Sequence, residues 1–237
     1  MPRYPVKLPL NSSAEAGGVA AVDRALSLLS AFGPGDRELS LATLTQRTHL
    51  VKSTALRLLA SLAHAGFLRR TPDGLYAIGP EIARLNGTFT TSFSLESAVT
   101  PELVKLSALT RETASFNVRQ GEFRVCLHRV NSPQPIHSHV QIGELLPLDR
   151  GAGGRVLLAY SGAKGAIYDR IRRDGFVALQ GDRVPDLTGI SAPVTGPDGK
   201  LVGALILTLP TYRYKEKFVT PVREAARAVS ARLGGTP

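Results

Sequence analysis

The sequence predicts an α+β protein with a winged helix-turn-helix near its N-terminal end and a ligand-sensing domain after it. Three segments with apolar residues at helical spacing are followed by a strong hairpin signal, which is the element order of a winged helix-turn-helix. Beyond them, strand-like and helix-like stretches alternate, and a second hairpin signal occurs at residues 196–199. A chain of 237 residues is long enough for two domains of ordinary size.

The first two helices of the motif are expected over residues 18–32 and 41–48. The apolar stripe of the first helix consists of Val22, Leu26, Leu29 and Phe32. A glycine–proline–glycine run at residues 33–35 then ends this helix. Ser40 precedes the second helix and can cap it, because a serine hydroxyl accepts a hydrogen bond from a free N–H group of the first turn.

The third helix, expected over residues 51–65 and ended by Gly66, carries the strongest functional signal. Its inward face consists of Ala55, Leu58, Leu59 and Leu62. Its opposite face consists of Ser53, Thr54, Arg57, Ser61 and His64. Lys52 lies with Ser53 and Thr54 at the N-terminal end, where a recognition helix meets base edges and phosphates.

The motif is basic and predicts double-stranded DNA as a partner. No acidic residue occurs between Glu38 and Asp73, so the sequence indicates a cationic patch without internal neutralisation, formed by Arg47, Lys52, Arg57, Arg69 and Arg70. The expected DNA contacts are Lys52, Ser53, Thr54, Arg57, Ser61, Arg69 and Arg70. The alternative is an ordinary amphipathic hairpin with a solvated face. The hydroxyl pair at residues 53–54 argues against it, because a merely soluble helix favours Glu and Lys there.

A β-hairpin and a further helix are expected to complete the N-terminal half. Residues 67–70 and 75–78 can pair as the wing, joined by a turn that contains Asp73 and Gly74. Pro80 begins the following helix, whose apolar side consists of Ile82, Ala83 and Leu85. We interpret this helix as a linker between two domains and as a candidate dimer surface.

The C-terminal half is expected to mix strands with helices. A helix marked by Leu103, Leu106 and Leu109 precedes a hairpin of residues 113–119 and 123–130. Further strands are expected at 136–142 and 145–148, helices at 154–160 and 164–173, and a late hairpin of 191–195 with 201–209. A closing helix follows residue 220, with an apolar stripe of Val222, Ala225, Val229 and Leu233.

Charge and cysteine content narrow the class of protein. A formal net charge of +10 and a pI near 10.2 favour anionic partners. The single cysteine, Cys126, excludes an internal disulfide and a zinc site built on paired cysteines, and its place in a strand predicts a buried, inert thiol. The sequence has no bilayer-spanning apolar run and no leader-like start, so we expect a soluble, cytoplasmic protein without a membrane partner. Residues 1–17 are expected to form a flexible arm.

A glycine-rich turn at residues 151–155 opens one predicted helix and is a candidate anion site. Free backbone N–H groups and the positive end of the helix dipole favour a carboxylate at such a place. A dinucleotide site is not expected, because Val156 stands where the fingerprint requires its third glycine. Glycines that only permit a tight turn are the alternative interpretation.

Metal and catalytic chemistry find little support in the sequence. His137 and His139 would share one face of a strand, and His128 is the only further candidate ligand nearby. Zinc needs three or four protein ligands, so no metal is assigned. No cofactor is assigned either. The motifs of serine hydrolases, zinc proteases and P-loop enzymes are absent. No spaced carboxylate pair is formed by the aspartates at positions 169, 174, 182 and 186, so no catalytic residue is predicted.

Taken in order, these segments resemble the IclR family of bacterial transcription regulators from about Gly18 to Gly234. The resemblance is carried by AVDRAL at 21–26, KSTALRLLASL at 52–62, LPL at 146–148 with the glycine turn and LLA at 157–159, SAPV at 191–194, GAL at 203–205 and the closing helix from Ala226. No single motif is decisive, but their order and spacing together are specific.

The resemblance implies a winged helix-turn-helix domain over residues 18–79, a linker helix over 80–94 and a GAF-like effector-binding domain over 95–237. It also implies dimers or dimers of dimers, a palindromic operator, and a small organic acid as the effector. The family's pocket positions correspond to Leu146, Leu148, Ala152, Gly153, Leu179, Gly189, Ile206 and Thr208.

The sequence departs from the family pattern at several positions. His49 stands in the helix-turn-helix turn where glycine is usual; histidine can adopt a positive φ at a cost, so the sequence indicates either a strained turn or a turn of different shape. Asp149 and Arg155 replace the usual histidine and lysine around the glycine turn, and the late strand offers only Thr208 where two serines are common. This pattern predicts a rather apolar pocket and an effector with an apolar or aromatic body, its carboxylate held by backbone N–H groups near Gly153.

The sequence therefore predicts a ligand-responsive, sequence-specific regulator of transcription. The alternative is an enzyme that acts on a small organic acid and carries a DNA-binding-like appendage, although no nucleophile–base pair or metal set surrounds the glycine turn. A non-specific DNA-packaging protein would need neither the ligand-sensing half nor the hydroxyl-rich face of the third helix.

Overall fold

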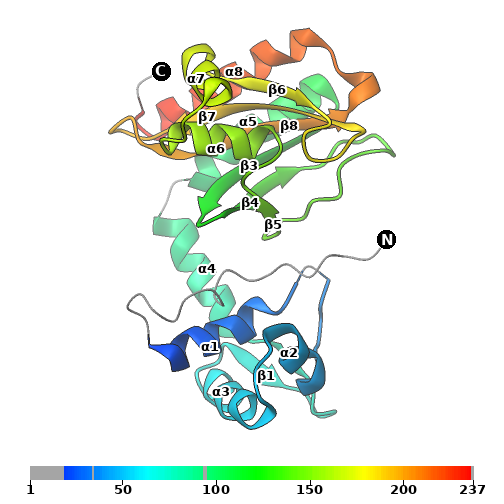
Figure 1. Cartoon of the computed structure of the whole chain (residues 1–237), viewed down its shortest axis with the longest axis vertical. Helices are drawn as coiled ribbons and strands as arrows, with labels where there is room; N and C mark the ends of the chain where they lie inside the picture. The colour runs from blue at the N-terminus through cyan, green and yellow to red at the C-terminus, as the bar shows by residue number, and fades with distance from the viewer. Residues whose placement is uncertain (1–18, 34, 93–94, 236–237) are drawn as a thin grey trace. The chain divides into compact units, whose positions relative to one another are not determined.

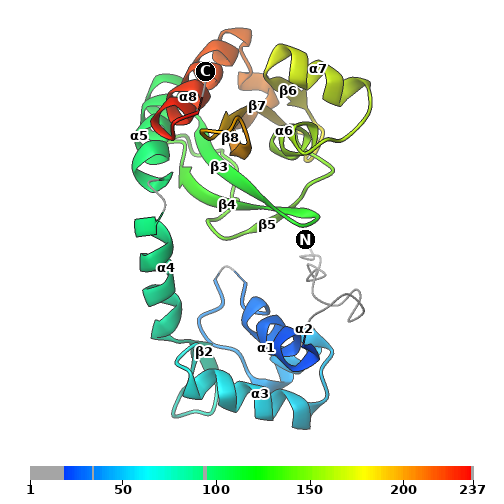
Figure 2. The ribbon, with the colours of Figure 1, turned by 90° about the vertical axis from the view of Figure 1, so that its left-hand side faces the viewer.

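The computed structural model describes residues 19–33, 35–92 and 95–235, so the predicted arm at residues 1–17 lies outside the described residues. The chain divides into two compact units, Met1–Ser92 and Phe93–Pro237 (Figures 1 and 2). The described residues of both units mix helices with antiparallel strands, which confirms the predicted α+β class. In the described part of the chain, no helix has both the length and the apolar character needed to cross a bilayer.

The first unit contains the predicted three helices, hairpin and following helix. Their bounds are α1 Ala20–Ser30, α2 Leu41–Thr48, α3 Lys52–His64, β1 Leu68–Arg70, β2 Tyr76–Ile78 and α4 Pro80–Ser92. The strands β1 and β2 pair antiparallel, with Leu68 opposite Ile78. The core of this unit joins Leu28 of α1, Leu44 of α2 and Leu59 of α3, each of which is fully buried.

The predicted apolar stripe of α1 is half right: Leu29 and Phe32 pack against the core, but Val22 and Leu26 do not. Val22 and Leu26 are 53% and 44% exposed, whereas Leu28 and Ala31 are buried in the core. The helix carries apolar residues around most of its circumference, so periodicity alone could not select the face that packs on α2 and α3.

The two ends of α2 have the local chemistry that the sequence predicted. The Ser40 hydroxyl accepts a hydrogen bond from the Thr43 N–H group and caps the first turn. His49 ends the helix with φ 57° and ψ 22°, the left-handed conformation that glycine adopts more easily. The turn before α3 therefore holds a strained residue at the position where the resemblance indicated a departure.

The second unit is built on one six-stranded antiparallel sheet with the order β5-β4-β3-β8-β7-β6. The strands are β3 Thr113–Gln120, β4 Phe123–Val130, β5 Leu145–Pro147, β6 Val177–Gln180, β7 Leu187–Thr195 and β8 Leu201–Pro210. The helices are α5 Leu95–Thr110, α6 Ala152–Tyr160, α7 Ala166–Asp174 and α8 Val219–Arg232, with 3₁₀ turns at Thr211–Arg213 and Glu216–Phe218.

Helices cover both faces of this sheet (Figure 2). Helices α5 and α8 form one core with Leu205 and Leu207 of β8. Helices α6 and α7 form the other core with Ala204 and Ile206 of the same strand. Because successive residues of a strand point to opposite faces, the central strand β8 must be apolar almost throughout, as its sequence is.

The structure differs from the prediction most in the segment before β5. Residues 136–142 form no strand, and Ile136 and Ile142 are each 61% exposed. Arginine side chains hold this segment instead: Arg129 donates to the Ser138 carbonyl and Arg213 to the Ile136 carbonyl. Strand β6 was not predicted, and β7 begins four residues before the predicted start at Ser191.

We expect the His49→Gly substitution to stabilise the first unit by about 1 kcal/mol, because glycine adopts the left-handed conformation without the Cβ clash. The measurement is the free energy of opening of the α2 and α3 amides by native-state hydrogen exchange. His64→Gly is the matched control, since His64 lies in the last turn of α3 and glycine there should lose about 0.5–1 kcal/mol. Equal effects at the two positions would contradict this assignment of strain to His49.

Candidate nucleic-acid interface and ligand pocket

The predicted DNA-contacting residues lie on the exposed side of α3 and on β1. Lys52, Ser53, Arg57 and Ser61 are exposed, and Thr54 is half-buried. The inward residues Ala55, Leu59 and Leu62 are buried, so the division of α3 into two faces is as predicted. Arg24 of α1 borders a hollow with Ser53, Thr54 and Arg57. Sequence reasoning missed Arg24, because only packing of α1 beside α3 brings it there.

The cationic patch is partly neutralised, contrary to the sequence-based interpretation. Arg47 forms an ion pair with Asp36 and also donates to the Ala31 carbonyl. Arg69 lies 3.9 Å from Glu38, an exposed and weak pair. Lys52, Arg57 and Arg70 form no ion pair among the described residues, so the free positive charge concentrates on the start of α3 and on the end of β1.

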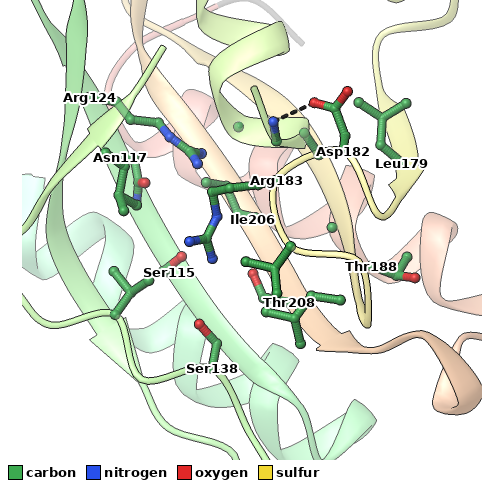
Figure 3. Close-up of a pocket in the computed structure, with 18 of the residues that line it drawn as sticks. Ser115, Asn117, Arg124, Ser138, Leu179, Asp182, Arg183, Thr188, Ile206 and Thr208 are labelled. Atoms are coloured by element: carbon green, nitrogen blue, oxygen red, sulfur yellow. Dashed lines mark hydrogen bonds between the residues drawn. The ribbon is translucent and has the colours of Figure 1, made fainter. Parts of the chain in front are cut away.

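A small pocket lies in the second unit between the first turn of α6 and the sheet (Figure 3). Its free volume is about 40 Å³. Seven of the eight predicted pocket positions line it, namely Leu146, Ala152, Gly153, Leu179, Gly189, Ile206 and Thr208. Leu148, the eighth, is only 2% exposed and packs in the core beneath α6.

The pocket is more polar than the sequence predicted. Ser115 and Asn117 come from β3, Arg124 and Arg129 from β4, and Arg183 from the turn after β6. The prediction of an apolar pocket with few side-chain donors is therefore wrong. It considered the glycine turn and the late strands only, whereas the register places Ser115 opposite Ile206 and so brings β3 into the pocket.

Arg124 is the most unusual of these residues. It is 3% exposed, and among the described residues its guanidinium makes no hydrogen bond and no ion pair. Burial lowers the pKa of Arg124 to about 10, and the positive charge of Arg183 adds to this shift. The Nδ2 atom of Asn117 is likewise buried without a partner. Unpartnered buried polar atoms are rare and need an explanation, which a bound ligand would supply.

The position of Arg124 depends on the absence of a side chain at Gly153. A Cβ atom at Gly153 would lie 2.5 Å from Nη1 of Arg124 and 2.2 Å from Cδ1 of Ile206. The guanidinium therefore lies directly against the first turn of α6. A cation is disfavoured at the positive end of a helix dipole, so an anion placed between the two would be stabilised by both.

The N-terminus of α6 is already partly occupied. Asp182 accepts a hydrogen bond from the Gly151 N–H group and forms an ion pair with Arg155, Nη2 to Oδ1 3.1 Å. Burial opposes ionisation of Asp182, but the hydrogen bonds from Arg155 and Gly151 outweigh it and hold the pKa of Asp182 below its usual value. The N–H groups of Ala152, Gly153 and Gly154 make no hydrogen bond within the described residues, and Ala152 and Gly153 line the pocket.

Other candidate centres in the second unit do not assemble. The His137 and His139 rings lie 5.0 Å apart, but the described residues contain no group of three or more metal-ligating side chains. Nδ1 of His137 contacts the Gln134 carbonyl. Cys126 is buried, and burial raises the pKa of its thiol to about 11, so it is unreactive at neutral pH as predicted.

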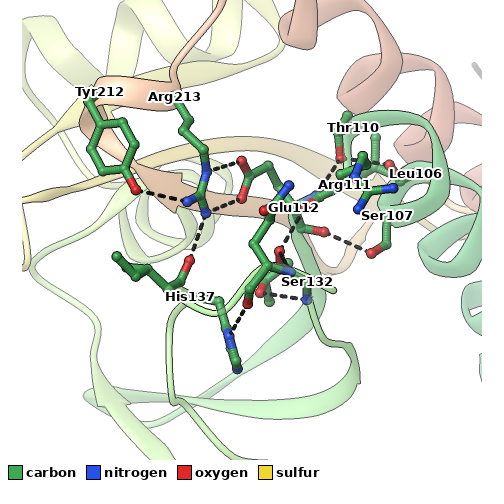
Figure 4. Close-up of polar contacts among 12 residues, drawn as sticks. Leu106, Ser107, Thr110, Arg111, Glu112, Ser132, His137, Tyr212 and Arg213 are labelled. Atoms are coloured by element: carbon green, nitrogen blue, oxygen red, sulfur yellow. Dashed lines mark hydrogen bonds and ion pairs between the residues drawn. The ribbon is translucent and has the colours of Figure 1, made fainter.

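A buried ion pair shows what a structural arginine looks like in the same unit (Figure 4). Arg213 donates through Nε and Nη2 to the two carboxylate oxygens of Glu112, at 2.6 and 2.9 Å. It also donates to the Ile136 carbonyl, and the Glu112 side chain is only 4% exposed. Each of the three guanidinium nitrogens of Arg213 donates at least one hydrogen bond, in contrast to Arg124.

Comparisons with known proteins match both units. The model of the IclR helix-turn-helix domain matches residues 21–72, and that of the C-terminal domain of bacterial IclR transcriptional regulators matches residues 88–168. The HTH-type transcriptional regulator KdgR of Escherichia coli is 24% identical over 91% of this chain and 93% of its own length.

Two solved structures share the fold. A putative IclR transcriptional regulator from Silicibacter sp. TM1040 has a TM-score of 0.80 and 27% identity, covering 91% of this chain and 97% of its own. An IclR homologue from Microbacterium hydrocarbonoxydans, complexed with 4-hydroxybenzoate, has a TM-score of 0.79 and 22% identity, covering 90% and 99%.

Replacing Arg124 by methionine is expected to stabilise the ligand-free second unit by about 1–3 kcal/mol, because an unpaired buried charge is removed and the alkyl packing is kept. Arg213→Met is the control of opposite sign: it leaves Glu112 buried without a partner and should cost about 3–5 kcal/mol. Opening free energies of the β3 and β8 amides, measured by hydrogen exchange, report both effects. Destabilisation of similar size by both substitutions would mean that Arg124 is structural.

Proposed function

Because the chain belongs to the IclR family of bacterial transcriptional regulators, we propose that it binds a palindromic operator and that a small organic acid in the pocket of the second unit modulates this binding. Its family consists of regulators with a DNA-binding helix-turn-helix and a C-terminal effector domain, so the alternative of an enzyme with a DNA-binding-like appendage is wrong.

The observation that carries the effector proposal is the buried, unpartnered guanidinium of Arg124 beside the first turn of α6. A carboxylate is the planar acceptor that fits an arginine, because two parallel N–H···O bonds can form. The free N–H groups of Gly153 and its neighbours would supply further donors to the same anion. The acid would thus compensate both the orphaned cation and the helix dipole.

The proposed DNA contacts divide according to their place in the fold. The start of α3, with Lys52, Ser53 and Thr54, would enter the major groove, and Arg57 one turn later would reach a base edge. Ser61 lies further along the same exposed face. Arg69 and Arg70 on the wing would contact phosphates and position the motif.

A palindromic operator requires two copies of α3 related by a two-fold axis, so the proposal includes a homodimer or a dimer of dimers. The domain boundaries remain as proposed from the sequence: a DNA-binding domain over 18–79, a linker helix over 80–94 and an effector-binding domain over 95–237. Such a regulator would act where the bacterial chromosome lies, in the cytoplasm.

An aromatic acid is the second candidate for the effector. The homologue with bound 4-hydroxybenzoate favours it, as does the apolar wall formed by Leu146, Leu179 and Ile206. The free volume of about 40 Å³ favours a short acid instead, because one water already needs about 10–15 Å³ on this measure. An aromatic ring would therefore require pocket side chains to move.

The effector proposal is tested by calorimetric titration of the full-length protein with short and aromatic carboxylates. Arg124→Gln is expected to weaken binding of the active acid by about 10-fold or more, because a charge-assisted hydrogen-bonded pair is lost. Arg170→Gln is the matched control, since Arg170 is an exposed arginine on α7 that does not line the pocket. An acid that binds equally to wild type and Arg124→Gln would overturn the assignment of the pocket.

Arg57→Ala is expected to weaken binding to the cognate operator by about 1–3 kcal/mol and to relax specificity at one base pair. The operator is selected from random duplexes, and affinities are measured by fluorescence anisotropy at fixed salt concentration. Arg227→Ala, an exposed position on α8, is the control and should leave affinity unchanged. A loss of equal size on random DNA would reassign Arg57 to a phosphate contact.

A further inference from the structure

A second arginine that forms no ion pair among the described residues lies in the same pocket as Arg124. Arg183, in the turn between β6 and β7, is half-buried and makes no ion pair or hydrogen bond among the described residues. Figure 3 shows the guanidinium groups of Arg124 and Arg183 pointing into one cavity from different walls. Burial is the main cause that lowers the pKa of Arg183, as it is for Arg124.

The charged groups around this cavity do not balance. Three arginines line it, Arg124, Arg129 and Arg183, against one acid, Asp182. Asp182 is already engaged by Arg155 and by the Gly151 N–H group. The other acid that acts on Arg129 and Arg183 is Glu144, whose carboxylate accepts from the Gln141 N–H group. The lining alone therefore has two positive charges in excess.

The three arginines are not equally available to a ligand. Arg129 donates to Oδ1 of Asn131 at 2.6 Å and to the Ser138 carbonyl, so it is committed to holding the segment that borders the pocket. Arg124 and Arg183 retain all their donors. The two available guanidinium groups carry like charges in one cavity and therefore repel each other; after burial, the charge of Arg183 is the next cause that lowers the pKa of Arg124. One bound negative charge would leave the second cation uncompensated in a poorly solvated place.

The size of the cavity limits the ligand further. The free volume of the cavity is about 40 Å³, so it is small. The hydroxyl groups of Ser115, Thr188 and Thr208 add neutral donors and acceptors to the lining. The space and the charge together favour a ligand in which two negative charges lie close to each other.

We propose that this pocket selects a compact dianion, with one negative charge on Arg124 and the α6 N-terminus and the other on Arg183. This inference rests on the proposed function and specifies the class of its effector. Two sources share the chemistry: a short aliphatic dicarboxylate, and a phosphate group that carries both charges on one centre. Both match the planar donor fork of arginine.

The test compares anions of similar size at constant ionic strength by calorimetric titration of the full-length protein. Malonate and succinate represent dicarboxylates, acetate and butyrate the matching monoacids, and inorganic phosphate the phosphoryl source. A dianion is expected to bind at least about 10-fold more tightly than the matching monoacid, the gain from one additional charge-assisted contact. Preference for phosphate over both dicarboxylates would support the proposal and identify the source.

Arg183→Gln is expected to reduce the ratio of dianion to monoacid affinity to near one, while binding through Arg124 persists. Arg170→Gln is again the control and should preserve the ratio, and an unchanged thermal midpoint shows that Arg183→Gln is folded. Monoacids that bind as tightly as dianions, or a preference that survives Arg183→Gln, would overturn the dianion proposal and leave the proposed function standing. If no anion or aromatic acid bound with any dependence on Arg124, both proposals would fall.

Discussion

The second unit depends on a sheet that is covered by helices on both faces. Leu205 and Leu207 of β8 supply the core beneath α5 and α8, while Ala204 and Ile206 supply the core beneath α6 and α7. Burial of both faces leaves no room for polar side chains unless they are paired or line a cavity. The pocket lies where the second of these cores ends, at the first turn of α6, and this is where Arg124 and Asn117 leave buried atoms without partners.

Three arginines in this unit illustrate the difference between a guanidinium that is paired with a carboxylate and one that is not. Arg213 meets the buried carboxylate of Glu112 with two hydrogen bonds and so fixes the chain around residues 111–136. Arg155 meets Asp182 and fastens the turn after β6 to the start of α6. That fastening also positions Arg183, the residue next to Asp182. Arg124 has no such partner, and a protein keeps an unpaired buried charge at a cost in stability that a ligand site explains.

The first unit uses charge in a different way. Its core cluster is apolar, and its cations lie at the surface, where Asp36 and Glu38 reduce the patch to the start of α3 and the end of β1. This narrower patch suits a motif that positions one helix in a groove, because diffuse positive charge would bind any duplex equally. His49 holds the turn before that helix in a left-handed conformation without glycine's freedom.

Local patterns in the sequence were sufficient to predict the elements whose ends are marked by capping, glycine or turn residues. The Ser40 cap, the left-handed His49, the two hairpins and the apolar face of α3 depend on residues close in the chain, and each was predictable from them. Residues 136–142 alternate like a strand but are held by Arg129 and Arg213, which no local pattern reveals. The glycine turn indicated an anion site, yet the cations that define it come from β4 and the turn after β6.

The sequence by itself determined the fold class and the DNA-binding motif, because these follow from periodicity and turn chemistry. Only the tertiary structure decided the charge of the pocket, because strand register and packing on α6 bring Arg124 and Arg183 into one cavity.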